Sequence, residues 1–352
     1  MLFRSERSDQ RFYGMQTVAK LSTEILLMKA RNISFGKNDV PDNILAAEDF
    51  QDYLADTGFD DGISGFEQLD SMIGLDTIKK RIRELVVSMQ AQKNLFESGS
   101  EAVAPCYHMM FTGSPGTGKT MVARIVGKIF RESGLLPVGD LLEVSRFDMV
   151  GEYIGQTGPK TVALCRSAVG SVMFIDEAYL LNAGDGYESK DFGREAMGAL
   201  IAEMENNRDK FVVILAGYED DMEDLLKTNA GLRDRIPHKI HFESYGREEL
   251  FEIFKMQIKK GYSYSEEFLS TAWEYFLSLP DSFLQDKNFG NGRFVRNVVE
   301  RVRIKALLRQ MGEPQEGMTS LPLIPLDFTN AVADEDLVGI NKKNRLSRIG
   351  FL

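Results

Sequence analysis

Short apolar runs alternate with stretches of helical periodicity through the middle of the chain. The helical stretches carry apolar residues on one face, as Thr120–Phe130 does with Val122, Ile125, Val126 and Ile129. Alternation of this kind indicates a parallel sheet wrapped by helices, so we expect a doubly wound α/β domain. Its expected strands are Tyr107–Thr112, Leu141–Ser145, Val172–Ile175, Phe211–Ala216 and Lys239–Phe242.

The pattern becomes purely helical after this domain. It is helical from Gly246 to about Gln310, and a loop with three prolines, residues 313–326, precedes a short helix. We therefore predict a small all-helical subdomain at residues 246–338, behind an α/β domain at residues 66–245. A basic tail, residues 339–352, ends the chain.

The beginning of the chain has a different character. Residues 1–55 are helical and then mixed in pattern, and residues 56–65 are acidic and glycine-rich, which is typical of a linker. A glycine stands 35 residues before an Asp-Phe pair twice, at Gly14 and at Gly292. Two interpretations stay open: coincidence, or an N-terminal segment that is the remnant of an upstream module of the same type. In the second case Met15 stands where the later copy has Arg293.

Bulk composition excludes several classes of protein. The net charge of −11 argues against an electrostatic grip on nucleic acid, and four basic residues in the tail more often form a solvated end or a subunit contact. No apolar run approaches the length of a membrane span and the N-terminus has no signal-peptide pattern, so we expect a cytoplasmic protein without membrane insertion. The two cysteines, Cys106 and Cys165, are expected to be small buried side chains in a reducing compartment.

The segment Gly113–Thr120 matches the phosphate-binding pattern G-x-x-x-x-G-K-[ST] at every position. Its glycines let backbone N–H groups turn around phosphate oxygens, and the helix that follows directs its positive end at the same anion. Lys119 can reach the β- and γ-phosphates, and the Thr120 hydroxyl can hold Mg²⁺. The segment lies between an expected strand and an expected helix, which is the context this motif requires.

A pair of carboxylates follows another expected strand. Asp176 and Glu177 end the apolar run Val172–Ile175, 57 residues after Lys119. Ligands of open α/β sheets bind at this carboxyl edge. We expect Asp176 to hold Mg²⁺ through water and Glu177 to orient and deprotonate an attacking water.

A guanine nucleotide is the weaker alternative to ATP. Asp148–Gly151 has the form D-x-x-G, and Asn341–Asn344 comes close to N-K-x-D. The last position is Asn where Asp is needed to pair with guanine, and the segment lies far out in the tail. We therefore expect the base to be adenine.

Six segments occur in a fixed order along the chain: Leu69–Asp76, Gly113–Thr120, Phe174–Ala178, Val213–Tyr218, Asn229–Arg235 and Gly290–Asn297. Together they resemble an AAA+ ATPase, in particular the CbbX/CfxQ group. That group includes red-type Rubisco activases, the sporulation protein SpoVK and type VII secretion ATPases of the EccA kind. The resemblance covers residues 66–352.

This resemblance implies a set of nucleotide-binding residues. Ile73 and Gly74 would lie against the adenine. Tyr218 would stand where many AAA+ proteins place a polar sensor after the fourth strand. The whole set implied for the cofactors ATP and Mg²⁺ is Ile73, Gly74, Ser114, Pro115, Gly116, Thr117, Gly118, Lys119, Thr120, Met121, Tyr218, Arg293 and Arg296.

Two arginines would complete the catalytic set with Lys119, Asp176 and Glu177. The resemblance makes Arg235 the arginine finger for the neighbouring subunit, with Arg233 as the alternative. It makes Arg293 the sensor of the helical lid, with Arg296, one turn on, as the alternative.

The glycine-rich segment Val150–Thr157 resembles the first pore loop of AAA+ threading machines. Tyr153, with Ile154 and Gly155, would offer an aromatic grip that tolerates many peptide sequences. The alternative is a tyrosine packed over its own helix. Residues 183–190 would form the second pore loop.

These features predict ATP hydrolysis in a ring of identical subunits, expected to be a hexamer, coupled to remodelling or threading of an unidentified protein client. The alternative from another class is an ATP-switched assembly scaffold that threads nothing. A DNA-associated AAA+ loader is less favoured, because the chain is acidic and carries the pore-loop tyrosine.

Overall fold

The computed structural model describes residues 62–98, 105–182, 187–259, 262–312 and 322–333. The N-terminal segment, the first part of the expected second pore loop and the basic tail lie outside these ranges. So do the N-K-x-D-like segment Asn341–Asn344 and Gly14, the first glycine of the internal comparison. The expected linker is described only from Gly62, and its last residues, Ser64 and Gly65, already begin a helix.

Five parallel strands form one sheet in the order β2-β3-β4-β1-β5. All five predicted strands are present, with ends displaced by no more than two residues. Because the strands are parallel, their carboxyl ends lie on one edge of the sheet, where ligands bind in open α/β folds. The strands are β1 (Met109–Gly113), β2 (Leu141–Val144), β3 (Val172–Ile175), β4 (Val212–Gly217) and β5 (His238–Phe242).

Alternate residues of each strand enter two different cores, one on each face of the sheet. In β3, Val172 and Phe174 join the first core while Met173 and Ile175 join the second. Both faces are buried, which explains why the strands appear in the sequence as continuous apolar runs. The first core is closed by α4 (Gly65–Ser71), α5 (Asp76–Glu97) and α6 (Lys119–Glu132).

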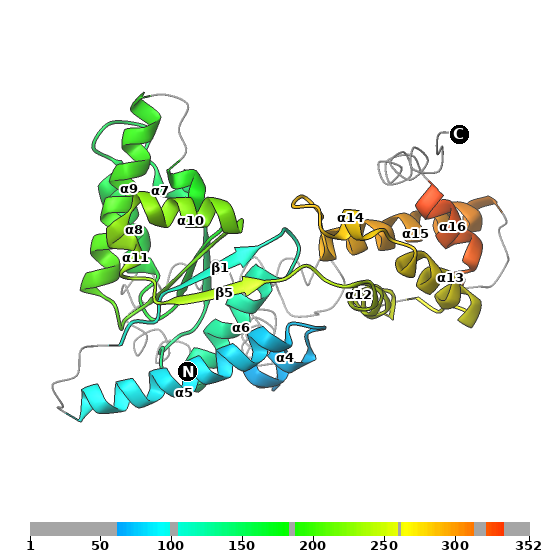
Figure 1. Ribbon diagram of the computed structural model, residues 1–352, viewed down its shortest axis with the longest axis horizontal. Helices are drawn as coiled ribbons and strands as arrows, with labels where there is room; N and C mark the ends of the chain where they lie inside the picture. The colour runs from blue at the N-terminus through cyan, green and yellow to red at the C-terminus, as the bar shows by residue number, and fades with distance from the viewer. Residues whose placement is uncertain (1–61, 99–104, 183–186, 260–261, 313–321, 334–352) are drawn as a thin grey trace, which may run out of the picture.

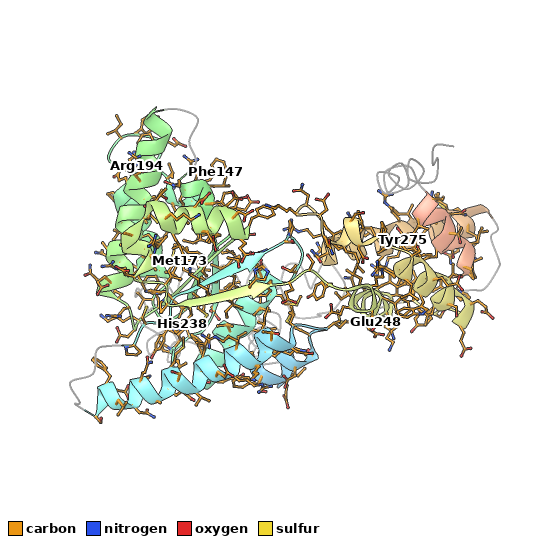
Figure 2. The ribbon with its side chains drawn as sticks, in the orientation of Figure 1. Phe147, Met173, Arg194, His238, Glu248 and Tyr275 are labelled. Carbon is orange, nitrogen blue, oxygen red and sulfur yellow. The ribbon has the colours of Figure 1, made fainter. Side chains whose placement is uncertain are left out.

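The second core lies under the remaining helices of the α/β domain, and Figure 1 shows this layer across the sheet from α4, α5 and α6. It is closed by α7 (Arg146–Met149), α8 (Thr157–Ser167), α9 (Tyr187–Asn206), α10 (Glu219–Thr228) and α11 (Ala230–Arg233). Figure 2 shows Met173 inside this domain, with Phe147 and Arg194 at the outer end of the same layer.

A buried histidine joins the sheet to this helical layer. The Val213 N–H donates to His108 Nδ1 over 3.1 Å, and His108 Nε2 lies 3.1 Å from the Met204 carbonyl oxygen. The proton therefore lies on Nε2, which donates to Met204. Burial lowers the pKa of His108 to about 4, so the ring is neutral at pH 7.

The C-terminal part is an all-helical subdomain with an aromatic core, here called the lid. Rings of Phe254, Phe268, Phe276 and Phe328 meet with centroids 5.5 to 6.0 Å apart. Figure 2 labels Tyr275 within this cluster of helices. The lid consists of α12 (Arg247–Lys259), α13 (Glu266–Leu277), α14 (Asp281–Leu284), α15 (Gly292–Gly312) and α16 (Pro325–Ala333).

The lid departs from the predicted pattern at two points. The expected loop at residues 313–326 ends earlier, because Pro325 is the first residue of α16, where its fixed φ and missing N–H suit a helix start. A single bridge also pairs Tyr264 with Leu323. Buried Asp327 accepts two bonds from the Arg309 guanidinium, at 2.9 and 2.8 Å, which fixes α16 against α15.

Candidate nucleotide site

The loop between β1 and α6 has the geometry of a phosphate cradle. Gly116 and Gly118 have φ of 71° and 96°, conformations that other residues adopt only with strain. The helix begins at Lys119, and its N-cap, Gly118, has no side chain to occupy the first-turn amides. An anion is the partner that such a helix start favours.

The Lys119 ammonium lies folded against this loop. Nζ donates to the carbonyl oxygens of Gly113 and Ser114, at 2.8 Å each. Burial lowers its pKa to about 8; Asp176 opposes that shift and Arg293 adds to it. Three residues that were singled out on separate segments are therefore close enough to interact electrostatically.

The paired carboxylates stand at the carboxyl end of β3. Asp176 and Glu177 are exposed, and the Glu177 N–H donates to Asp176 Oδ1 over 3.1 Å. Glu177 has φ of 50°, a left-handed conformation that is uncommon for a non-glycine residue and is often found at functional sites. Helix α6, which carries Thr120, packs against β3. A hydroxyl and a carboxylate are oxygen donors that suit Mg²⁺.

Two tyrosines lie beside these carboxylates. The rings of Tyr179 and Tyr218 are 6.1 Å apart, and burial and Glu177 raise the pKa of Tyr179 to about 12. Tyr218 is the N-cap residue of α10, directly after β4. The sequence indicated Tyr218 by its place after the fourth strand, but no pattern indicated Tyr179.

The segment expected to meet adenine lies at the junction of the α/β domain and the lid. Ile73 packs on the lid core. Gly74 has φ of 62°, and a Cβ atom there would lie 2.1 Å from Glu249 Oε1 and 3.6 Å from the Tyr245 ring. Met72 approaches within 3.2 Å of the Cβ position of Gly118, so this segment adjoins the phosphate loop.

The start of α15 rests directly on the phosphate loop. The Gly292 N–H donates to the Gly116 carbonyl over 3.0 Å. Arg293 and Arg296, which follow on the same helix, are exposed. The structure thus brings one end of the lid to Gly116 and Lys119, and Arg293 is the arginine whose charge acts on Lys119.

Comparison with known proteins agrees with this arrangement. The family described as ATPases associated with various cellular activities (AAA) matches residues 109–244, and the AAA lid domain matches residues 246–336. Protein CbbX of Cereibacter sphaeroides is 42% identical over 241 residues, which cover 68% of this chain and 76% of CbbX. The chain belongs to the CbbX/CfxQ group of AAA+ ATPases. It is accordingly a nucleotide-binding ATPase.

Other relatives place this AAA+ chain in the same group. Stage V sporulation protein K of Bacillus subtilis (strain 168) is 39% identical over 249 residues, 70% of this chain and 76% of that protein. Among solved structures, the FIGL-1 AAA domain in complex with ADP superposes with a TM-score of 0.53 at 19% identity. That match covers 80% of this chain and 90% of the other, and it shows the shared fold.

The two candidate finger arginines of this AAA+ chain differ in their surroundings. Arg235 is half-buried: Nη1 donates to the Gly231 carbonyl over 2.8 Å, and Nε lies 2.9 Å from Glu205 Oε2. That Nε–H is not aimed at the carboxylate, so the contact is one of charge rather than a hydrogen bond. Arg233 is exposed and donates to the Leu226 carbonyl over 3.2 Å. The choice between them stays a prediction.

The loop between α7 and α8 presents its side chains to solvent. Tyr153 is 68% exposed and Ile154 is 89% exposed, so Tyr153 does not pack over its own helix. Gly155 follows with φ of 83°. The base of the loop is fixed, because Lys160 Nζ donates to the carbonyls of Phe147 and Val150 at 2.8 Å each.

Other residues singled out in the sequence have structural partners. Asp148 completes a capping box with Ser145, whose hydrogen bonds lower the pKa of the carboxyl, so the D-x-x-G form reflects a helix start. Cys165 is buried as expected, but the expectation is wrong for Cys106, which is only half-buried because it lies ahead of β1, with its thiol 3.4 Å from the Arg235 carbonyl. Met121 is exposed on the first turn of α6. In the ranges the structure describes, no helix is long and apolar enough to cross a membrane.

Proposed function

We propose that this ATPase works as a ring of identical subunits, expected to be a hexamer, and remodels a protein client that contacts the central pore. The functional module would span residues 66–338. The observation that carries the proposal is the convergence of Lys119, Asp176 and Arg293 at a loop on which the lid rests.

The hydrolytic step uses groups at the carboxyl edge of the sheet. Glu177 orients a water molecule and accepts its proton as the water attacks the γ-phosphate. Lys119 leaves the carbonyls of Gly113 and Ser114 and neutralises phosphate oxygens. Thr120 and Asp176, the latter through water, hold Mg²⁺, which when bound neutralises charge on the phosphates. Arg293 of the lid adds positive charge beside Lys119.

The neighbouring subunit would supply the last positive charge. Arg235, with Arg233 as the alternative, lies near α11 on the α/β domain rather than with the phosphate loop of its own chain, which suits a residue that acts across a subunit boundary. A finger supplied in this way makes hydrolysis depend on assembly.

The client would be a polypeptide held by the exposed loop. Tyr153 and Ile154 offer an apolar surface that needs no particular peptide sequence, while the Lys160 contacts keep the base of the loop in place. One relative, from Cyanidioschyzon merolae, carries the name ribulose bisphosphate carboxylase/oxygenase activase and is 38% identical over 256 residues. Its name supports protein remodelling as the class of activity.

Glu177→Gln tests the hydrolytic assignment. The amide keeps the size of the side chain and cannot accept the proton, so ATP binding stays and turnover falls by about a hundredfold or more. Glu143→Gln, on the exposed side of β2, is the matched control and keeps the parent rate. Hydrolysis at the parent rate by Glu177→Gln would show that another group activates the water.

Tyr153→Ala separates a threading machine from a scaffold. Proteins captured by the Glu177→Gln variant in the presence of ATP serve as clients for the assay. A threading machine loses remodelling in Tyr153→Ala, keeps ATP hydrolysis, and regains remodelling in Tyr153→Phe. If the protein is a scaffold, the parent, Tyr153→Ala and Tyr153→Phe all assemble and all bind the partner equally well. Stimulation of ATP hydrolysis by DNA would instead support the alternative of a DNA-associated AAA+ loader.

A further inference from the structure

Asn291 occupies a special position between the lid and the phosphate loop. It lies between Gly290 and Gly292, at the start of α15, and its side chain is completely buried. Its φ of 46° is left-handed, a conformation that asparagine adopts more readily than most residues. A buried amide needs hydrogen-bond partners, and those of Asn291 come from three separate segments.

The amide oxygen and nitrogen of Asn291 have different partners. Oδ1 accepts the Tyr245 N–H over 2.9 Å, at the hinge where the α/β domain passes into the lid. Nδ2 donates to the Pro115 carbonyl of the phosphate loop over 3.2 Å and to the Phe289 carbonyl of the lid over 3.0 Å. One side chain therefore joins hinge, phosphate loop and lid.

Neighbouring contacts also hold the hinge and the start of the lid close to the phosphate loop. The Tyr245 hydroxyl donates to the Thr117 carbonyl over 3.2 Å. The Gly290 carbonyl oxygen would lie only 2.1 Å from a Cβ atom on Gly116, so backbone meets backbone there. The phosphate loop is therefore in direct contact with the segment that leads into α15, which begins at Gly292, one residue before Arg293.

A second bridge between the lid and the α/β domain lies on the surface and provides a comparison. Lys287 pairs with Asp220, and both side chains are largely exposed. Exposed ion pairs contribute little to stability, whereas a buried amide that loses its partners leaves several groups unsatisfied. The two contacts thus differ in strength although both connect the lid to the α/β domain.

We propose that Asn291 is a positioning residue: it fixes the lid to the phosphate loop and so places Arg293 beside the bound phosphates. This inference rests on the proposed role of Arg293 in nucleotide hydrolysis. Occupation of the loop by phosphates is transmitted through Pro115 and Asn291 to the hinge at Tyr245, and the lid then moves with the loop.

Asn291→Gly is the informative substitution, because glycine adopts the same φ without strain and only the side chain is lost. Asn291→Asp keeps an acceptor for the Tyr245 N–H but places an oxygen against the carbonyls of Pro115 and Phe289. The controls are Asn288→Gly, an exposed asparagine in the same loop, and Lys287→Ala, the surface bridge.

Hydrogen exchange of the full chain measures the coupling, with the non-hydrolysable analogue adenylyl imidodiphosphate and Mg²⁺ as the probe. In the parent protein and both controls, the probe protects peptides from the phosphate loop and from the lid start, residues 289–296. In Asn291→Gly and Asn291→Asp it protects the phosphate loop alone, and the lid start exchanges about tenfold faster. Equal protection of the lid start in Asn291→Gly and the parent would overturn the inference.

Turnover supplies a second readout that a loss of stability alone does not move. Arg293→Ala lowers kcat by about tenfold in the parent but by less than about threefold in the Asn291→Gly background, because Arg293 is already misplaced there. An equal loss in both backgrounds contradicts the inference.

The hydrogen-exchange experiment separates failure of the two proposals. If the probe leaves the phosphate loop of the parent protein unprotected, the proposed nucleotide site is wrong. If it protects that loop but not the lid start of the parent protein, only the positioning role of Asn291 is wrong.

Discussion

Raising the pH above 8 should weaken ATP binding through a single group, Lys119. Burial in the loop lowers its pKa to about 8 when no phosphate is present. Phosphate oxygens favour the charged ammonium and raise that pKa again. At a pH where Lys119 of the nucleotide-free protein has lost its proton, ATP binding must therefore take that proton up again. The affinity for ATP is thus highest well below pH 8 and falls as the pH rises above 8.

The size of the effect follows from the pKa of the free protein. With a pKa near 8, the ammonium is charged in about 90% of molecules at pH 7 and in about 10% at pH 9, so affinity falls about tenfold between them. Isothermal titration calorimetry between pH 7.5 and 9.5, in buffers of different ionisation enthalpy, gives both the dissociation constant and the protons taken up. We expect uptake to approach one proton per nucleotide at pH 9.

A matched pair of variants assigns the proton. Lys119→Arg stays charged throughout this range, so its affinity, whatever its value, should not fall with pH. Lys80→Arg, on the exposed side of α5, should keep the parent slope. The reasoning is refuted if the parent binds ATP equally well at pH 7.5 and 9.5, or if Lys119→Arg takes up the same proton.

Three further results are expected. Because the folded pKa of His108 is about 4, against 6.5 when unfolded, the free energy of unfolding should fall by about 3 kcal/mol between pH 6.5 and pH 4, and less in His108→Gln, as measured by urea denaturation. Gly116→Ala should lose ATP affinity about tenfold or more, whereas Gly134→Ala, with a similar φ of 68° but open space around it, should keep that affinity. Phe254→Ala should destabilise the lid by about 3–5 kcal/mol in thermal unfolding; a loss below about 1 kcal/mol would contradict its packing in the aromatic core.

The α/β domain was predictable because its strands are buried on both faces. Val172–Ile175 is apolar at every position and appears unchanged as β3. The first strand begins two residues late, at Met109, because His108 uses its ring, rather than a regular ladder, to bind the Val213 N–H. No periodicity reveals that choice, since a histidine in an apolar run has the same pattern whether its ring faces solvent or a backbone amide.

The candidate site was predictable where its functional residues are close together in the sequence. The phosphate loop and the Asp176–Glu177 pair each need only a strand end and the turn after it, and both are local patterns. The finger was not resolved, because Arg233 and Arg235 stand two residues apart and their roles depend on a neighbouring subunit. Tyr179 and Tyr245 were missed because their importance comes only from what lies next to them.

The sequence by itself determined the order of strands and helices, the loop that suits phosphates, and the carboxylates at the sheet edge, because these depend on hydrophobic period and on residues close in the chain. Tertiary structure alone decided how those parts act together. Asn291 reaches Pro115 across 176 positions of sequence and Tyr245 reaches Thr117 across 128. Such contacts, and the lowered pKa of Lys119, arise from the orientation of the lid on the loop. That orientation is set by packing between distant segments, and no local pattern encodes it.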